Sequence, residues 1–350
     1  MKIGSVALEH PTALAPMAGM TDTAFRRLVK RHGGCGLVVT EMVSSEGLVR
    51  GIDRTLEYAE YTEEERPVSI QIFGGDPAVM AEAARIVEGM GADIVDINMG
   101  CPVPKIAKHN AGCSLMREPS HAADVVRAMA LAVSIPVTVK MRAGWNEREI
   151  NAPELARMVE DAGAAAVAVH GRTAAQSYTG ESDWSLIGQV AEGVSIPVFG
   201  SGDCVEPGQV ASRLQDGRID GVLIGRGALR NPWIFSQAAE AASGQAPAPI
   251  GAAERGQFLL EYIDLLLKER VDEAVGFRHS APGQAAGAPA PARGRERWVI
   301  NKVRALGSWY TKGLEGGSAL RVAINSTDSI QALRDLIGSF FFRGSEVFVR

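Results

Sequence analysis

The chain has 350 residues, of which 46% are hydrophobic and 22% charged, so it is long enough for one barrel-sized domain plus an appendage. No run of about 18 apolar residues occurs, and the amino-terminal stretch is only briefly apolar, so we expect no membrane segment and a cytoplasmic protein. The four cysteines, Cys35, Cys101, Cys113 and Cys204, have neither CxxC spacing nor clustered histidines, which argues against a metal site and against disulfides.

The net charge of -5 conceals an uneven distribution along the chain. Residues 278–350 contain 11 Lys and Arg against 5 Asp and Glu, whereas residues 1–277 contain 25 against 36. A basic carboxyl-terminal end is typical of an RNA-binding surface, although terminal modules also differ in charge by chance.

Short apolar runs rich in β-branched residues alternate with helical patterns over the first 225 residues, which predicts a parallel sheet. Eight runs occur, and eight parallel strands favour a closed (β/α)8 TIM barrel. The runs are Ala13–Ala15, Leu37–Thr40, Val68–Ile72, Ile94–Asn98, Val137–Met141, Val167–His170, Val198–Gly200 and Val222–Ile224. The helical segments between them include Pro77–Gly89, Ala122–Ala132 and Pro153–Ala162.

After Pro232 the pattern becomes all-helical, which predicts a small second domain. We expect the barrel domain in residues 1–240 and the helical domain in residues 251–350. The expected helices are Glu254–Glu273, Trp298–Lys312 and Ser329–Phe341. The segment HSAPGQAAGAPAPARGR is rich in Ala, Pro and Gly, which predicts a low-complexity loop near residues 278–295.

Catalytic groups of such barrels lie at the carboxyl ends of the strands, so the residues that follow each run are the candidates. The loop that begins Pro16-Met17-Ala18 could support a flat aromatic cofactor, or simply be a tight turn. Gln71 could bind the same cofactor or cap the barrel mouth.

Two basic residues end neighbouring runs. A cation at Lys140 would stabilise the negative charge of a reduced flavin. His170 could bind the cofactor or its phosphate, or be structural.

The fourth run leads into Asn98 and Cys101, an amide and a thiol three residues apart. A thiol with a pKa of about 8.5 is mostly protonated at neutral pH, so Cys101 could act as a proton donor, and Asn98 could bind the polar edge of a pyrimidine. A lone cysteine is otherwise an inert buried residue, which is our interpretation of the other three.

Glycine-rich turns follow the last two runs, at Ser201-Gly202-Asp203 and Gly225-Arg226. Phosphate binding after strands seven and eight is common in this fold, so the pair predicts a phosphate site.

The motifs APMAGMTD, DINMGCPVPK with NAG following, VTVKMRAGW, HGRT, the SGD turn and GRGALRNPWIF resemble those of the tRNA-dihydrouridine synthases, specifically the bacterial branch. The similarity spans nearly the whole expected barrel. Related flavin barrels such as dihydroorotate dehydrogenases share the phosphate turns but not the NMGCP loop.

The resemblance implies that FMN lies across the mouth of the barrel domain, that NADPH or NADH reduces it, and that hydride passes from its N5 to C6 of a uridine flipped out of tRNA. Cys101 would then protonate C5. The positions that match flavin-binding residues of the family are Pro16, Met17, Ala18, Gln71, Lys140, His170, Ser201, Gly202, Asp203, Gly225 and Arg226. Asn98 matches a uracil contact.

The resemblance also implies that the helical domain binds tRNA, with Arg304 and Lys312 beside Trp309 and Tyr310 as a backbone-and-stacking surface. Charged helix faces exposed to solvent are common, so the alternative is that this surface is simply solvated and does not bind RNA. Two basic positions of the family's pattern are lost here, and Ser201 replaces the usual Asn. We expect a monomer whose partner is tRNA. The alternatives are a flavin reductase of a small metabolite and an RNA-binding protein without catalysis.

Overall fold

The computed structural model describes residues 1–107, 110–268 and 292–342, and its strands form a closed parallel barrel. All eight expected runs are barrel strands, with limits within one residue of those predicted. The ring runs β4-β3-β11-β10-β9-β8-β7-β6 and is closed by pairing of β4 with β6. The barrel strands are β3 (Thr12–Leu14), β4 (Leu37–Val39), β6 (Val68–Phe73), β7 (Ile94–Met99), β8 (Val137–Arg142), β9 (Ala166–His170), β10 (Val198–Ser201) and β11 (Gly221–Ile224), and a short β5 (Val43–Ser44) pairs with β6.

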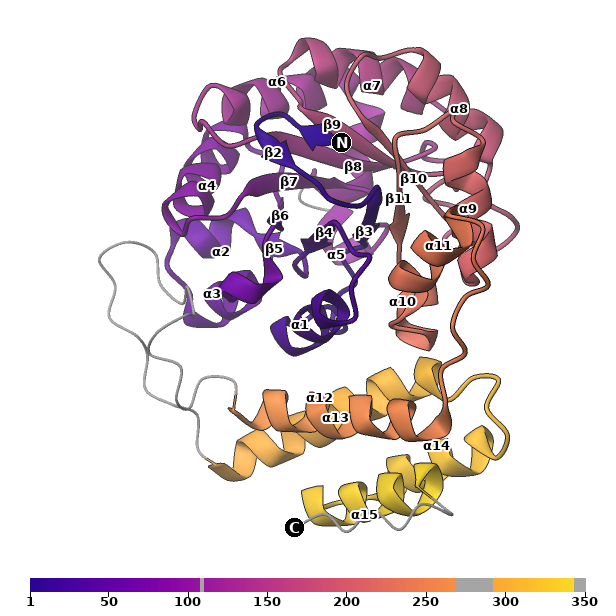
Figure 1. Ribbon diagram of the computed structural model, residues 1–350. Coiled ribbons are helices and arrows are strands. Elements are labelled where there is room, and N and C mark those ends of the chain that lie inside the picture. The colour runs from indigo at the N-terminus through magenta and orange to yellow at the C-terminus, as the bar shows by residue number, and fades with distance from the viewer. Residues whose placement is uncertain (108–109, 269–291, 343–350) are drawn as a thin grey trace.

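The amino end of the barrel is covered by a short antiparallel hairpin, β1 (Lys2–Ile3) and β2 (Val6–Ala7), which lies in front in Figure 1. Ile3 is 2% exposed and packs with barrel-lining side chains such as Leu37 and Phe199. Strands of two residues are too short to show a periodicity, so sequence analysis does not detect this hairpin. Because this end is plugged, ligands have access from the carboxyl end.

Helices cover the outside of the barrel, and the capping residues explain where they begin. Asp76 accepts hydrogen bonds from the backbone N–H groups of Ala78 and Val79, at 2.9 and 3.0 Å, and thereby starts α4. These helices are α1 (Thr23–Arg31), α2 (Ser45–Val49), α3 (Asp53–Ala59), α4 (Pro77–Gly89), α5 (Pro104–Ala107), α6 (Pro119–Ala130), α7 (Ala152–Asp161), α8 (Trp184–Glu192), α9 (Pro207–Gln215), α10 (Arg226–Arg230) and α11 (Ile234–Ala242), with 3-10 turns at Glu63–Glu65 and Gly112–Arg117.

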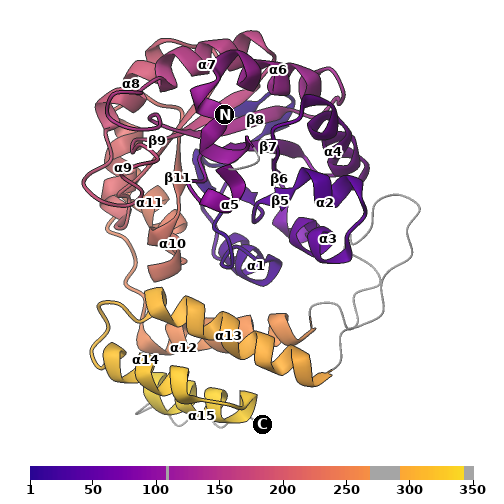
Figure 2. The same cartoon turned by 180° about the vertical axis from the view of Figure 1, so that it is seen from behind.

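The carboxyl-terminal region is helical and lies beside α1 and α10, as both views show (Figures 1 and 2). Its helices are α12 (Ala252–Lys268), α13 (Ala292–Tyr310), α14 (Gly317–Ser326) and α15 (Ile330–Phe341). Phe25 of α1 makes edge contacts with Phe258 and Tyr262 of α12, at centroid distances of 6.1 and 6.4 Å. The two regions therefore share an apolar interface.

The structure changes three expectations for this region. Helix α14 was not predicted, because it starts at a left-handed Gly316 without a side-chain cap. Helix α13 begins at Ala292, so the last four residues of the expected low-complexity loop are helical. Tyr310 is fully buried and its hydroxyl donates to the carbonyl of Arg255, so its ring belongs to the core and not to a stacking surface. The rest of the expected loop, and the end of Glu254–Glu273, lie outside the described residues.

Candidate active site

Polar side chains from several strands meet at the carboxyl end of the barrel. Lys140 on β8, His170 at the end of β9 and Arg226 after β11 line a cavity together with Pro16 and Met17. In a parallel barrel all carboxyl ends lie at one face, which brings residues from distant parts of the sequence together. Of the residues expected to bind a cofactor, the cavity contains Pro16, Met17, Lys140, His170, Ser201, Gly202, Asp203, Gly225 and Arg226.

The two glycine-rich turns form one wall of this cavity. Gly202 has φ of +126°, and a Cβ built on it would lie 2.2 Å from the Ser182 hydroxyl, so only glycine fits there. Asp203 also has a left-handed backbone, with φ of +57°. Gly225 precedes α10, and a Cβ built on it would lie in ordinary contact with Met17 Sδ, at 3.5 Å. Apart from Arg226, these turns present backbone and small side chains to the cavity.

The Asp203 carboxylate is already occupied within the protein. It accepts two hydrogen bonds from Arg172, at 2.7 and 2.8 Å, and one from the Ser182 N–H at 2.7 Å. Burial opposes its ionisation, but these hydrogen bonds and the Arg172 and Arg226 charges hold its pKa below the ordinary value. Asp203 therefore positions Arg172 and its own turn.

The cavity has a positive electrostatic character. Burial, reinforced by Lys140, Arg142, Arg172 and Arg226, lowers the pKa of His170 to about 2, so the imidazole is neutral at physiological pH. Burial, with Arg142, also lowers the pKa of Lys140 to about 8. Several cations with few nearby carboxylates suit an anionic ligand.

Tyr178, on the loop between β9 and α8, lies over the cavity and is 60% exposed. Its ring lies 5.0 Å from the Arg226 guanidinium and 5.7 Å from that of Arg142. A guanidinium cation and the face of an aromatic ring attract each other. These two contacts therefore hold the Tyr178 ring at the rim of the site.

Cys101 follows β7 on the same face of the barrel. Asn98 accepts hydrogen bonds through Oδ1 from the backbone N–H groups of Gly100 and Cys101, at 3.1 and 2.9 Å, while Arg142 donates to the Gly100 carbonyl at 2.8 Å. The thiol is half-buried, and burial raises its pKa although Arg142 and Lys140 oppose this shift. The thiol is therefore protonated at neutral pH and can donate a proton.

The other three cysteines are buried more deeply than Cys101, although Cys204 lines the cavity. Burial raises the pKa of Cys35 and of Cys204 to about 12, and that of Cys113 to about 11. They have the environment of inert core residues.

Gln71 and Ala18 lie next to the cavity without lining it. Gln71 is 1% exposed, and its amide is bonded to Asp96 and Asn98. Ala18 lines an adjoining cleft between the barrel and α13, together with Met42 and Trp298. The sulfur of Met42 lies 3.8 Å from Asn98 Nδ2, so the cleft leads toward the Cys101 loop.

Arg304 and Lys312 lie on and just after α13. Arg304 donates to the carbonyls of Thr327 and Ile324 and to the Asn301 side chain, at 2.6, 3.5 and 3.1 Å, and so holds the carboxyl end of α14. Lys312 is exposed, with its ammonium 3.9 Å from the Trp309 ring centroid. The first is engaged within the protein, whereas the second faces solvent.

Sequence reasoning did not select Arg142 or Tyr178 as site residues, and Arg172 occurred there only within the HGRT motif. Arg142 ends β8 two residues after Lys140, so the rule that selected Lys140 also selects Arg142. Tyr178 lies in a long loop, where the sequence has no pattern that would place its ring over the cavity.

Among the residues that the structure describes, no three His, Cys, Asp or Glu side chains are grouped so that they could hold a metal ion. Within the same ranges, no helix has the length and apolar character needed to span a bilayer.

Comparisons with known proteins agree with this arrangement. Residues 13–288 match the family model described as dihydrouridine synthase. A probable tRNA-dihydrouridine synthase of Rickettsia bellii is 37% identical over 342 residues, covering 97% of this chain and 98% of its own. One from Rhodobacter capsulatus is 43% identical over 270 residues, covering 76% of this chain and 83% of its own.

Among solved structures, histamine dehydrogenase from Rhizobium sp. 4-9 superposes with a TM-score of 0.53 at 15% identity, covering 75% of this chain and 50% of its own. At that identity the likeness shows the barrel fold alone. The family model and the relatives of matching length carry the assignment: the chain belongs to the dihydrouridine synthase family.

Proposed function

We propose that the protein is a tRNA-dihydrouridine synthase that uses FMN, and NADPH or NADH as reductant, to reduce the C5=C6 bond of specific tRNA uridines. The observation that carries the proposal is a half-buried thiol, kept protonated, on the same barrel mouth as a cation-lined cavity. Saturating this bond requires a hydride donor at C6 and an acid within reach of C5. When bound, FMN supplies the hydride from its N5.

The cavity walls fit the phosphate end of FMN. The turns at Ser201–Asp203 and Gly225–Arg226 present backbone, and the Arg226 guanidinium is partly exposed, at 32% of its side chain. Arg172 neutralises Asp203, which removes the repulsion that a free carboxylate would exert on phosphate. Ser201, Gly202, Asp203, Gly225 and Arg226 would therefore hold the phosphate.

The remaining flavin-binding residues would contact the ring system. Pro16, Met17 and Ala18 would support its face, and Gln71 would bind its polar edge through the Nε2 hydrogen that is not donated to Asp96. Lys140 would place a cation where the reduced ring carries negative charge. His170 remains neutral, so it would serve as a hydrogen-bond partner and not as a charge.

Cys101 and Asn98 would act on the uracil. The Nδ2 hydrogen of Asn98 that is not donated to Gln71 would bind the polar edge of the base, and the Cys101 thiol would transfer its proton to C5. The base must leave its stack to reach this depth, because the thiol lies within the barrel mouth.

The helical region would bind the tRNA. The cleft between α13 and the barrel, lined by Trp298 and Lys302, leads toward Asn98. Exposed Lys312 beside Trp309 would contact the RNA backbone, and Arg304 would support this surface by holding α14.

The decisive experiment is nucleoside mass spectrometry of tRNA that lacks dihydrouridine, after incubation with the protein, FMN and NADPH. New dihydrouridine supports the proposal. Its absence, with a flavin that NADPH still bleaches, would indicate a reductase of a small metabolite instead.

Cys101→Ala tests the acid role directly. Because only the proton donor is removed, flavin binding and reduction by NADPH should stay at the wild-type level, while turnover on tRNA falls by about 10² or more. Stopped-flow absorbance of the flavin measures both half-reactions separately, and Cys35→Ala, which changes a buried thiol outside the cavity, serves as the control. Full tRNA turnover in Cys101→Ala would contradict the assignment.

A further inference from the structure

Buried polar side chains on two neighbouring strands form one chain of hydrogen bonds that ends at the Cys101 backbone. Gln71 on β6 donates through Nε2 to Asp96 Oδ2 at 2.7 Å, and Asn98 donates through Nδ2 to Gln71 Oε1 at 2.7 Å. Asn98 Oδ1 then accepts from the N–H of Cys101 at 2.9 Å. Asp96 thus stands three hydrogen bonds away from the thiol-bearing residue.

The groups at both ends of this chain of hydrogen bonds fix the same donor-to-acceptor direction through the two amides. Asp96 Oδ2 accepts, so the Gln71 amide must present its NH2 group to it and its oxygen to Asn98. At the other end two backbone N–H groups require the Asn98 oxygen, which leaves the Asn98 NH2 group for Gln71. Reversing either amide would place two donors or two acceptors against each other.

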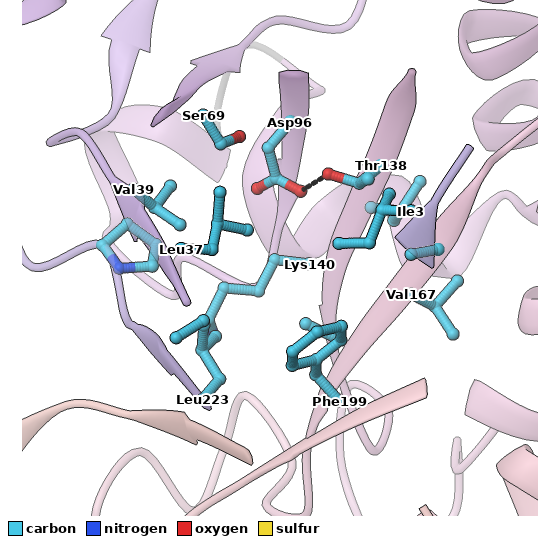
Figure 3. A pocket seen from close by; sticks show the side chains of 15 residues that line it. Ile3, Leu37, Val39, Ser69, Asp96, Thr138, Lys140, Val167, Phe199 and Leu223 are labelled. Carbon is cyan, nitrogen blue, oxygen red and sulfur yellow. Dashed lines mark hydrogen bonds between the residues drawn. The ribbon is translucent and has the colours of Figure 1, made fainter. Parts of the chain in front are cut away.

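Asp96 is held in place from its other side. Its side chain is buried, with the residue 6% exposed, and Thr138 Oγ1 donates to Oδ1 at 2.6 Å, as Figure 3 shows. Burial raises the pKa of Asp96, whereas Gln71, Thr138 and Lys140 oppose the shift. The direction of the chain is the same in either state, because a proton on Oδ1 can be shared with the Thr138 hydroxyl while Oδ2 still accepts from Gln71.

We propose that Asp96 is a positioning residue, which acts through Gln71 and Asn98 to hold the Gly100–Cys101 turn and therefore the Cys101 thiol. Without an acceptor at position 96, the buried Gln71 amide loses its partner and can reorient, so Asn98 Nδ2 loses its acceptor. Asn98 Oδ1 is then no longer held toward the two N–H groups of the turn. The inference rests on the proposed function only in that Cys101 is the acid whose position matters.

Ser69 provides a matched control on the same strand. It lies two residues before Gln71, and its hydroxyl is buried without a hydrogen-bond partner. A second cavity, inside the barrel, is lined by both Ser69 and Asp96, and the Ser69 side chain points toward Asp96 in Figure 3. Ser69→Ala thus changes a buried hydroxyl beside Asp96 without touching the chain.

The test measures how fast iodoacetamide alkylates Cys101 in the full-length protein between about pH 6 and pH 10, with peptide mass spectrometry to read each cysteine. Asp96→Ala should loosen the turn and raise the rate by about threefold or more, with a lower apparent thiol pKa as burial decreases. Asp96→Asn should retain the wild-type profile, because its Oδ1 can still accept from Gln71. Ser69→Ala should also match the wild type.

If Asp96→Ala does not fold, Gln71→Met interrupts the chain with a side chain of similar size and should give the same faster alkylation. Wild-type rates in these interrupted variants, or an equal increase in Asp96→Asn or Ser69→Ala, would overturn the proposal. The assay needs neither FMN nor tRNA, so it is judged separately from the proposed function. A wild-type protein that forms no dihydrouridine would refute the function and leave the alkylation result standing.

Discussion

Cys101 and His170 face the same barrel mouth, and burial there keeps both in their neutral forms. Burial disfavours charge, so the pKa of the thiol rises and that of the imidazole falls. For the thiol this is useful, because an acid must carry its proton at working pH. For the imidazole it means that His170 contributes no charge at neutral pH, and that the cavity's positive charge comes from its lysine and arginines.

The pH dependence of tRNA reduction should report the Cys101 thiol. Activity should fall as pH rises through the raised thiol pKa, because the acid loses its proton. Cys101→Ser should be slower by about 10² but lack that part of the decline, since a hydroxyl does not ionise in this range. Lys140, with its pKa near 8, titrates in both proteins, so the difference between the two profiles isolates the thiol. Identical profiles would contradict the acid role.

His170 should make the folded state sensitive to acid. Its pKa is about 2 when folded and about 6.5 when unfolded, so below pH 6.5 the unfolded chain binds more protons and stability falls as pH decreases. Between pH 7 and pH 5 this amounts to about 2 kcal/mol. Urea midpoints at both pH values should show a smaller loss in His170→Gln than in the wild type, and an equal loss would refute this origin.

At the scale of elements, Lys302 on α13 connects the helical region to the loop after β3. Its ammonium lies 3.1 Å from Asp22, which caps α1, and 3.2 Å from Glu41. It also donates to the carbonyl of Gly19 at 3.0 Å, while Glu41 accepts from the N–H of Gly19 at 2.5 Å. Burial opposes the charge, but the two carboxylates hold the pKa of Lys302 above its ordinary value.

Lys302→Met should therefore destabilise the protein substantially. The Lys302 side chain is 13% exposed and those of Asp22 and Glu41 are 9% and 7%, so two buried carboxylates lose their counter-ion, at a cost of about 3 kcal/mol. Lys312→Met, which removes an exposed lysine after the same helix, should cost less than about 1 kcal/mol. Chemical denaturation measures both, and equal effects would show that Lys302 does not lock the interface.

At the scale of the whole molecule, the charge is segregated between an acidic barrel and a basic carboxyl-terminal end. A polyanion is thus attracted to one side of the protein and repelled from the rest. The apolar contacts of α12 with α1 and the Lys302 ion pairs fix the described part of this basic end, residues 292–342, beside the barrel mouth. In the proposed function this directs tRNA toward Cys101.

Lys312→Ala should weaken tRNA binding and reduce the slope of log Kd against log salt by about 1, because one phosphate contact is lost. Lys2→Ala removes an exposed lysine at the opposite, plugged end of the barrel and should leave the slope unchanged. Filter binding at several salt concentrations measures both slopes. An unchanged slope in Lys312→Ala would place the RNA surface elsewhere.

The strands and the crossover helices could be predicted from the sequence because their signals are local. Runs such as Val222–Ile224 are apolar on both faces, and α4 carries its own cap, proline and terminal glycine. The rule that catalytic groups follow the strands also selected Lys140 and Cys101, because it needs only their position in the sequence and no knowledge of their contacts. The β1–β2 hairpin and α14 were not predicted, because two-residue strands and a helix without a side-chain cap have no such local signal.

The partners of these residues were decided only by the tertiary structure. Segments distant in sequence supply these partners. They decide that Asp203 is paired with Arg172, that Arg304 holds α14, and that Tyr310 lies in the core. The same holds for the Asp96–Gln71–Asn98 chain, which exists only because β6 and β7 pair in one register. Local sequence determines which side chains reach the barrel mouth, whereas closure of the barrel determines what each of them binds, and therefore its charge and its freedom to act.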